Sequence, residues 1–117
     1  MTDRLSSELW ISFASLLRSY TAARGLNKAE SADVMQKGDL IRIVAGNATM
    51  ELTLHPHSWG GSWCLSSGGS LERRGQLTLL PEGRIAVDGN ALDLDHAAID
   101  LVASLMSAAA ASARNER

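Results

Sequence analysis

Hydrophobic residues recur at helical spacing near both ends of the chain. Close to the N-terminus an apolar stripe is formed by Leu9, Phe13, Leu16, Leu17 and Tyr20. Ser6 or Ser7 suits the start of this helix as an N-cap and Gly25 suits its end. Close to the C-terminus a second stripe is formed by Ala98, Leu101, Val102, Leu105 and Ala109. The spacing predicts a helix over 7–24 and another over 96–111, each with one buried face.

Between the two helices the hydrophobic period changes to two. Ile41 and Ile43 flank Arg42, and after the turn at Gly46-Asn47 apolar residues alternate with polar ones up to Leu54. This alternation predicts a hairpin with one covered face and one exposed face. Further strands are predicted at 32–37, 62–67, 76–80 and 84–87, and the turns between them include Pro81-Glu82-Gly83 and Asp88-Gly89.

This order of elements predicts the α+β class. We expect a two-layer sandwich with an N-terminal helix, an antiparallel sheet of five to six strands and a C-terminal helix, both helices on one sheet face. The length of 117 residues and the 45% hydrophobic content fit a single domain over 1–117. Residues 112–117 are predicted to be a frayed tail.

Charge and composition narrow the partners and the compartment. The 11 basic and 13 acidic residues are spread along the chain without a basic stripe, so a nucleic-acid partner is not expected. There is no apolar run of spanning length and no signal-peptide pattern, so no membrane partner is expected either. The single cysteine, Cys64, excludes an intrachain disulfide and favours a cytoplasmic location.

The exposed sheet face is the first candidate for function. The alternation assigns to it the following polar or small residues: Arg42, Glu51, Thr53, His55, Ser62, Cys64, Ser66, Gln76 and Thr78. Such a mixed face suits either plain solvation or contact with a partner. Trp59 lies in a glycine-rich loop before Trp63, and an exposed tryptophan there would mark a contact site. The predicted binding residues are therefore Arg42, Thr53, His55, Trp59, Cys64 and Thr78.

Metal binding and catalysis are alternatives centred on two histidines. His55 and His57 flank Pro56, and with Cys64 they could begin a metal site. Cys64 could also be a nucleophile with either histidine as its base. A simpler interpretation is an edge-strand exit at Pro56 and a cysteine that packs as a small hydrophobe. Without a matched carboxylate or a second cysteine, we predict no metal, no cofactor and no catalytic residue.

Two other groups of residues have structural interpretations. Gly68-Gly69 and Gly75 are predicted to be turn residues, with Arg73-Arg74 at a solvated loop tip, because a phosphate loop needs a following Lys-Ser/Thr and a helix. Asp88 and Asp93 are predicted to serve a turn and the approach to the second helix, and Asp95 its N-cap.

The order of helix, antiparallel strands and helix resembles the layout of the frataxin family, small proteins that contact iron and the iron-sulfur assembly machinery. The hairpin 38–54 followed by Trp63 lies in a comparable place. In that family an acidic first helix binds metal, whereas the first helix here offers Glu8 together with Arg18 and Arg24. Pro56 stands seven residues before Trp63, which also differs from the family. The resemblance implies metal handling as an alternative function.

These observations favour a small non-enzymatic binding or interaction domain. We expect it to use its open sheet face for a protein partner or for self-association, and a homodimer is one such form. The alternatives are a metal-handling protein with a frataxin-like layout, or a small enzyme that uses Cys64 with His55 or His57.

Overall fold

The described residues of the protein form two helices and seven strands. The computed structural model describes residues 2–25, 32–55, 59–68, 70–80 and 82–115. The helices are α1 and α2, at Thr2–Gly25 and Leu94–Asn115. The strands β1 to β7 are Ala32–Lys37, Leu40–Ala45, Ala48–Leu54, Gly60–Ser67, Ser70–Leu80, Arg84–Val87 and Asn90–Asp93.

All seven strands form one antiparallel sheet in the order β1-β2-β3-β4-β5-β6-β7, so each strand pairs with its neighbours in the sequence. Short turns make this possible. Two-residue turns follow β1, β2 and β6, and the turn at Asp88-Gly89 has positive φ at both positions, 53° and 89°. A two-residue hairpin turn of this kind matches the right-handed twist of the strands that it joins.

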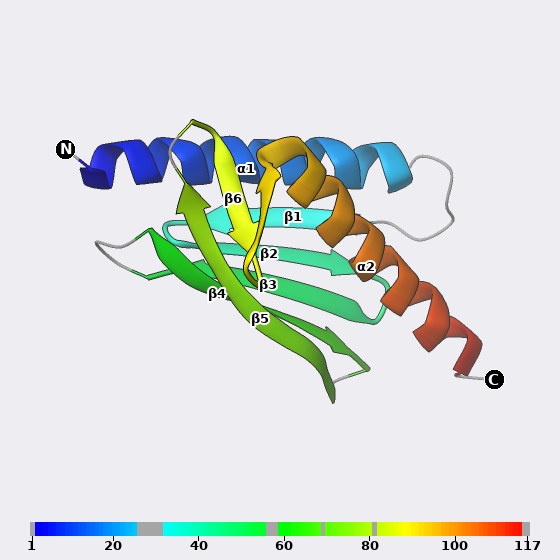
Figure 1. The fold of residues 1–117 in the computed structure, drawn as a ribbon. Helices are drawn as coiled ribbons and strands as arrows, with labels where there is room; N and C mark the ends of the chain where they lie inside the picture. Colours follow the sequence, from blue (N-terminus) through cyan, green and yellow to red (C-terminus); the bar gives the residue numbers. More distant parts are fainter. Residues whose placement is uncertain (1, 26–31, 56–58, 69, 81, 116–117) are drawn as a thin grey trace.

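Both helices cover the same face of the sheet, as the hydrophobic pattern predicts. α1 contacts β1 and β5, and α2 crosses the sheet and contacts β2, β3, β4, β6 and β7 (Figure 1). In β2 and β3 every second residue from Ile41 to Leu54 is buried. These side chains form one core with the buried faces of the helices. The opposite sheet face is left uncovered by any described element. Neither helix, over its described residues, is apolar enough to cross a membrane.

The buried face of α1 is turned relative to the predicted stripe. Phe13 and Leu17 are fully buried, whereas Leu9, Leu16 and Tyr20 are half-buried. Among the α1 side chains whose burial is described, the other buried ones are Trp10, Ala14 and Thr21. The predicted face of α2 is confirmed, since all five residues of its stripe are buried.

The sheet has seven strands, where the sequence predicts five to six. The additional strand, β7, lies between the Asp88-Gly89 turn and α2. It has only four residues, of which Leu92 alone is half-buried, and this is too short for a clear alternating pattern. Both helices are also longer than predicted: α1 begins at Thr2, and α2 includes 112–115, which we assigned to the tail.

Asp95 joins the two helices. α2 begins at Leu94, so Asp95 lies inside the first helical turn and is not the N-cap that the sequence predicts. The hydroxyl of Tyr20 donates a hydrogen bond to Asp95 Oδ1 at 3.0 Å. This hydrogen bond, with smaller contributions from desolvation and from the negative charge of Asp95, raises the pKa of Tyr20 above its ordinary value of 10.0.

Candidate functional site

Two surfaces of the protein have both a hollow and polar side chains, and each is a candidate binding site. The first is the open sheet face, by which we mean the face of β1–β7 away from the helices. The second is the helix-side cleft, a hollow between α2 and the strands β4 to β7. The two lie on opposite sides of the sheet and have different chemistry.

A row of four residues runs across the open sheet face. Arg42, Glu51, Cys64 and Arg74 are successive cross-strand partners on β2, β3, β4 and β5. The guanidinium of Arg42 donates to Glu51 Oε2, with Nε at 2.7 Å and Nη2 at 2.6 Å. Arg74 has no ion-pair partner among the side chains that the structure describes. The row therefore ends in a guanidinium that is free to bind a carboxylate.

A shallow hollow of about 470 Å³ lies over this row. It is lined by Glu51, Thr53, Ser62, Trp63, Cys64, Arg74, Gly75 and Gln76. Half of these residues are small, and each hydroxyl or amide among them can donate and accept. The hollow can therefore receive a polar side chain of a partner while Arg74 supplies a positive charge at its edge.

Apolar side chains lie beside the hollow on the same face. Met35 on β1 is 44% exposed and Val44 on β2 is 38% exposed. Their register partners Arg42 and Asp33 show that both residues are on the open sheet face. The open sheet face therefore presents two exposed apolar side chains on neighbouring strands, next to its polar residues.

The structure separates the residues that we considered for catalysis. The amide of His55 donates to the carbonyl of Gly60 at 2.9 Å, so His55 is level with Gly60 across the strands. Cys64 is four residues further along β4, which places the two side chains about 13 Å apart along the strand. Cys64 and His55 do not form a nucleophile-base pair. His57 lies outside the described residues. No group of three metal-ligating residues occurs in the described part of the chain.

The remaining predicted contact residues are distributed along the sheet. Thr53 lines the hollow beside Cys64. Thr78 is level with Gly60, on the far side of β4 from His55. Trp59 is half-buried and packs against the core, and its carbonyl accepts a hydrogen bond from the amide of Leu79 at 2.7 Å. Arg42, Thr53 and Cys64 are thus brought together, whereas His55, Thr78 and Trp59 lie toward one end of the sheet.

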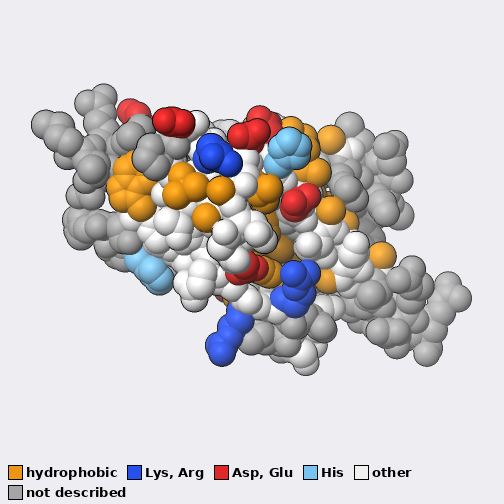
Figure 2. Space-filling model, in the orientation of Figure 1, with side chains coloured by type: hydrophobic (Ala, Val, Ile, Leu, Met, Phe, Trp, Pro, Cys, Tyr) orange, Lys and Arg blue, Asp and Glu red, His pale blue; other side chains and the backbone are white. Residues whose placement is uncertain are grey.

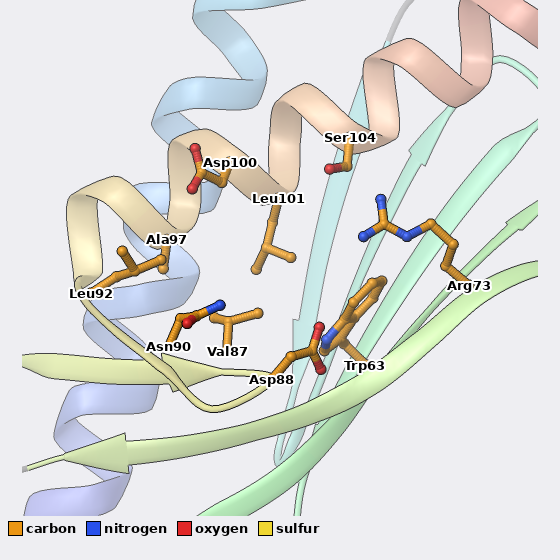
Figure 3. Close-up of a pocket in the computed structure, with 10 residues that line it drawn as sticks. All are labelled: Trp63, Arg73, Val87, Asp88, Asn90, Leu92, Ala97, Asp100, Leu101 and Ser104. Carbon is orange, nitrogen blue, oxygen red and sulfur yellow. The ribbon is translucent and has the colours of Figure 1, made fainter.

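The helix-side cleft was not predicted from the sequence. It has a volume of about 160 Å³ (Figure 3). Apolar residues of the strands and of α2 line its interior, and charged and polar side chains surround it; the lining residues are Trp63, Arg73, Val87, Asp88, Asn90, Leu92, Ala97, Asp100, Leu101 and Ser104. Figure 2 views the molecule from this side and shows acidic and basic side chains around a hydrophobic strip.

Gly75 shapes the wall of the cleft. A Cβ atom at this position would lie less than 3.0 Å from both Asp88 Oδ1 and Trp63 Nε1. Asp88 Oδ1 accepts a hydrogen bond from the amide of Gln76 at 2.9 Å, which holds the carboxylate over Gly75. The indole N–H of Trp63 is buried and has no hydrogen-bond partner among the described residues. Gly75 is therefore a strand residue that makes room for two side chains, and our prediction of a turn at this position is wrong.

Arg73 and Arg74 are also not at a loop tip. Both belong to β5, and because successive residues point to opposite faces they serve different surfaces. The guanidinium of Arg73 lies over the ring of Trp63, 5.5 Å from its centroid, in the helix-side cleft. Arg74 lies across from Cys64 on the open sheet face. The sequence did not predict a strand at Arg73 and Arg74, because the residues around them are polar and the hydrophobic alternation is restricted to the end of β5.

Comparison with known proteins does not assign the chain to a family. The chain has no significant match among protein-family models, curated proteins or solved structures. The function must therefore be argued from the two surfaces themselves.

Proposed function

We propose that the protein is a small binding domain that uses its open sheet face to hold a protein partner. The observation that carries the proposal is the combination, on one uncovered face, of a hollow with a free guanidinium at Arg74 and two exposed apolar side chains at Met35 and Val44. Interfaces combine such apolar contacts with a polar surrounding.

The chemistry of the face indicates what the partner presents. Glu51 is already engaged with Arg42, so Arg74 is the charge in the hollow that is left to pair. A partner carboxylate can bind Arg74 through two parallel hydrogen bonds. Beside it, apolar partner side chains can cover Met35 and Val44. We therefore propose a protein surface that carries at least one carboxylate next to apolar residues.

Cys64 provides a direct test, since it lies in the hollow and is the only cysteine in the chain. A photo-crosslinker attached to Cys64 should capture one protein reproducibly from the native cell extract. The control carries the same crosslinker at Ser12→Cys in a Cys64→Ser background, because Ser12 is exposed on α1 on the helix side of the molecule. Capture from Cys64 alone supports the proposal.

Variants of the face connect the captured protein to the proposed chemistry. Arg74→Glu should repel the partner carboxylate, and Thr53→Glu should place a second charge in the hollow. Both should reduce capture at least about tenfold, as expected when a charge pair is reversed. Thr53→Ser keeps the hydroxyl and should leave capture unchanged. Equal capture from position 12, or capture that Arg74→Glu does not alter, would contradict the proposal.

A second candidate is supported by the helix-side cleft. There the guanidinium of Arg73 lies over the ring of Trp63, whose buried indole N–H has no hydrogen-bond partner among the described residues, and Asp88 and Asp100 also line the cleft. We propose that this cleft can take a small zwitterion, whose carboxylate is bound by Arg73 and whose ammonium is bound by an aspartate. Titration with free amino acids should quench tryptophan fluorescence, and Arg73→Gln should remove the response. No saturable change with any amino acid would dismiss this candidate.

A further inference from the structure

β1 is an edge strand whose outer side is paired with no described strand. It pairs with β2 on one side, from Ala32↔Ala45 to Lys37↔Leu40, and it stands at the end of the strand order. The opposite edge, β7, has only four residues and continues at once into α2. Short edges are protected from pairing with another chain, whereas β1 has six residues and no proline.

The direction of the free backbone groups of β1 follows from the neighbouring hydrogen bonds. The carbonyl of Asp39 accepts a hydrogen bond from the amide of Leu54 on β3, so odd-numbered residues at this end of β2 face β3. Even-numbered residues of β2, starting with Leu40, therefore face β1, where their partners are Lys37, Met35 and Asp33. It follows that the N–H and C=O groups of Val34 and Gln36 point outward, away from β2.

The side chains of β1 alternate between the two faces. Asp33, Met35 and Lys37 are exposed on the open sheet face. Val34 and Gln36 point to the helix layer, where α1 contacts β1, and both are half-buried. The side-chain amide of Gln36 donates a hydrogen bond to the carbonyl of Gly38 at 2.8 Å, and no described backbone group is bonded to the outward N–H and C=O groups of Val34 and Gln36.

We propose that β1 pairs antiparallel with β1 of a second copy of this chain. In the proposed register Met35 lies opposite Met35 of the second copy, about a two-fold axis. Val34 and Gln36 of one copy then pair with Gln36 and Val34 of the other, and their outward backbone groups make four hydrogen bonds. Asp33 lies opposite Lys37 of the second copy, and Lys37 lies opposite its Asp33.

The charges select this register from its neighbours. Backbone pairing requires outward groups to meet, so the two nearest alternatives are centred on Val34 and on Gln36. Centred on Val34, Asp33 would face Met35 of the second copy. Centred on Gln36, Met35 would face Lys37. Both alternatives lose the two ion pairs and the Met35 contact, while a two-fold axis at Met35 makes the edge complementary to itself in charge as well as in hydrogen bonds.

The first experiment reverses the charge of Asp33 and the charge of Lys37 in two separate variants. Asp33→Lys leaves only positive charges at these two positions, and Lys37→Glu leaves only negative ones. Each variant should raise the dissociation constant of the dimer at least about tenfold, because both ion pairs become repulsive. Sedimentation equilibrium over a roughly micromolar range measures it, since a single six-residue edge is smaller than a standard interface.

Two combinations should restore association. The double variant Asp33→Lys/Lys37→Glu recovers opposite charges and should dimerise like the wild type. An equimolar mixture of the two single variants should form heterodimers, since the basic edge of one copy faces the acidic edge of the other. Loss of folding cannot mimic this pattern, because each single variant must be folded to associate in the mixture.

The sole cysteine gives an independent distance. In the joined sheet Met35, Arg42, Glu51 and Cys64 of each copy lie in one row, so seven strand spacings separate the two Cys64 residues. Spin labels on Cys64 should therefore lie about 30 Å apart, allowing for curvature of the sheet. A dimer formed by two open faces would bring the labels much closer together and would overturn the proposal.

The proposal can fail separately from the proposed function. A chain that stays monomeric at high concentration, or a dimer that ignores both single charge variants, would refute edge pairing. Neither result would contradict the proposal that the open sheet face binds a protein partner. In turn, Arg74→Glu should weaken partner capture without changing the dissociation constant of the dimer, because Arg74 is on β5, far from β1. The amides of Val34 and Gln36 should also exchange more slowly in the wild type than in Asp33→Lys.

Discussion

Replacing Gly75 by alanine should destabilise the protein, although alanine usually favours the folded chain. At most positions with an ordinary backbone, this substitution stabilises by about 0.4 to 1 kcal/mol because the unfolded chain loses freedom. Gly75 is not among the glycines with positive φ, so its backbone tolerates alanine. The obstacle is space, since the added methyl group would collide with Asp88 Oδ1 and Trp63 Nε1.

The magnitude follows from what must move. If the carboxylate of Asp88 leaves, its hydrogen bond to the Gln76 amide is lost, which costs about 1.5 kcal/mol, at the low end for a charged acceptor because Asp88 is exposed. Trp63 is 3% exposed and held in the core, so overpacking against its ring costs about 1 to 2 kcal/mol more. With the gain for alanine subtracted, we expect a loss of about 1.5 to 3 kcal/mol.

A double-mutant cycle identifies the cause. Asp88→Gly removes the carboxylate and keeps a residue that accepts the φ of 53° at this position. In that background Gly75→Ala should cost about 1.5 kcal/mol less than in the wild type, since only the collision with Trp63 is left. Urea denaturation followed by tryptophan fluorescence measures all four proteins, and Trp63 itself reports on the site.

Two results would refute this reasoning. If Gly75→Ala is as stable as the wild type or more so, the space above Gly75 is not filled by Asp88 and Trp63. If the two substitutions are additive, the carboxylate does not contribute to the cost at Gly75. In either case the wall of the helix-side cleft would differ from the one described above.

Three further predictions concern other parts of the molecule. Thr21 is 1% exposed and its hydroxyl has no hydrogen-bond partner among the described residues, so Thr21→Val should raise the free energy of unfolding by about 1 kcal/mol, measured by thermal denaturation. Tyr20 is the only tyrosine, so its absorbance titration should give a pKa above 10.0, and Asp95→Asn should lower it. Because the pKa is raised in the folded state, this contribution to stability is complete below pH 10.0 and is lost as the pH rises through the folded pKa, and Tyr20→Phe should remove that loss. Cys64 is half-buried on the open sheet face and should react fully with a thiol reagent in the native protein, whereas protection equal to that of a core residue would contradict its position.

The sequence was most informative where a single local rule determines the structure. The alternation from Ile41 to Leu54 needs only pleated strands with one covered face. In the structure every second residue of β2 and β3 is buried, as this alternation predicts. The stripe of α2 likewise needs only helical spacing. Such patterns depend on neighbours within one element, so the class, the layers and the order of elements could be predicted.

The sequence did not predict the role of a residue where that role depends on a contact with a residue far along the chain. Gly75 has a role only because Asp88 and Trp63 occupy the space above it, and Arg73 is explained by the Trp63 ring. These contacts join residues from two strands and a turn, and no local pattern encodes them. Consequently the first half of β5 looked like a loop, and the helix-side cleft that depends on it could not be predicted.

Together, the proposed edge pairing and the proposed binding face predict how many partner molecules bind to each dimer. Pairing through β1 joins the two sheets, and Met35 and Val44 of both copies then lie next to the two-fold axis. The hollows at Cys64 lie about 15 Å from that axis, one in each copy. A partner that binds mainly the apolar centre would occupy the axis once per dimer, whereas a partner that binds mainly Arg74 would bind once per copy. Native mass spectrometry of the captured complex distinguishes one partner per two chains from two, and in the Asp33→Lys variant only the second kind of partner should keep its affinity.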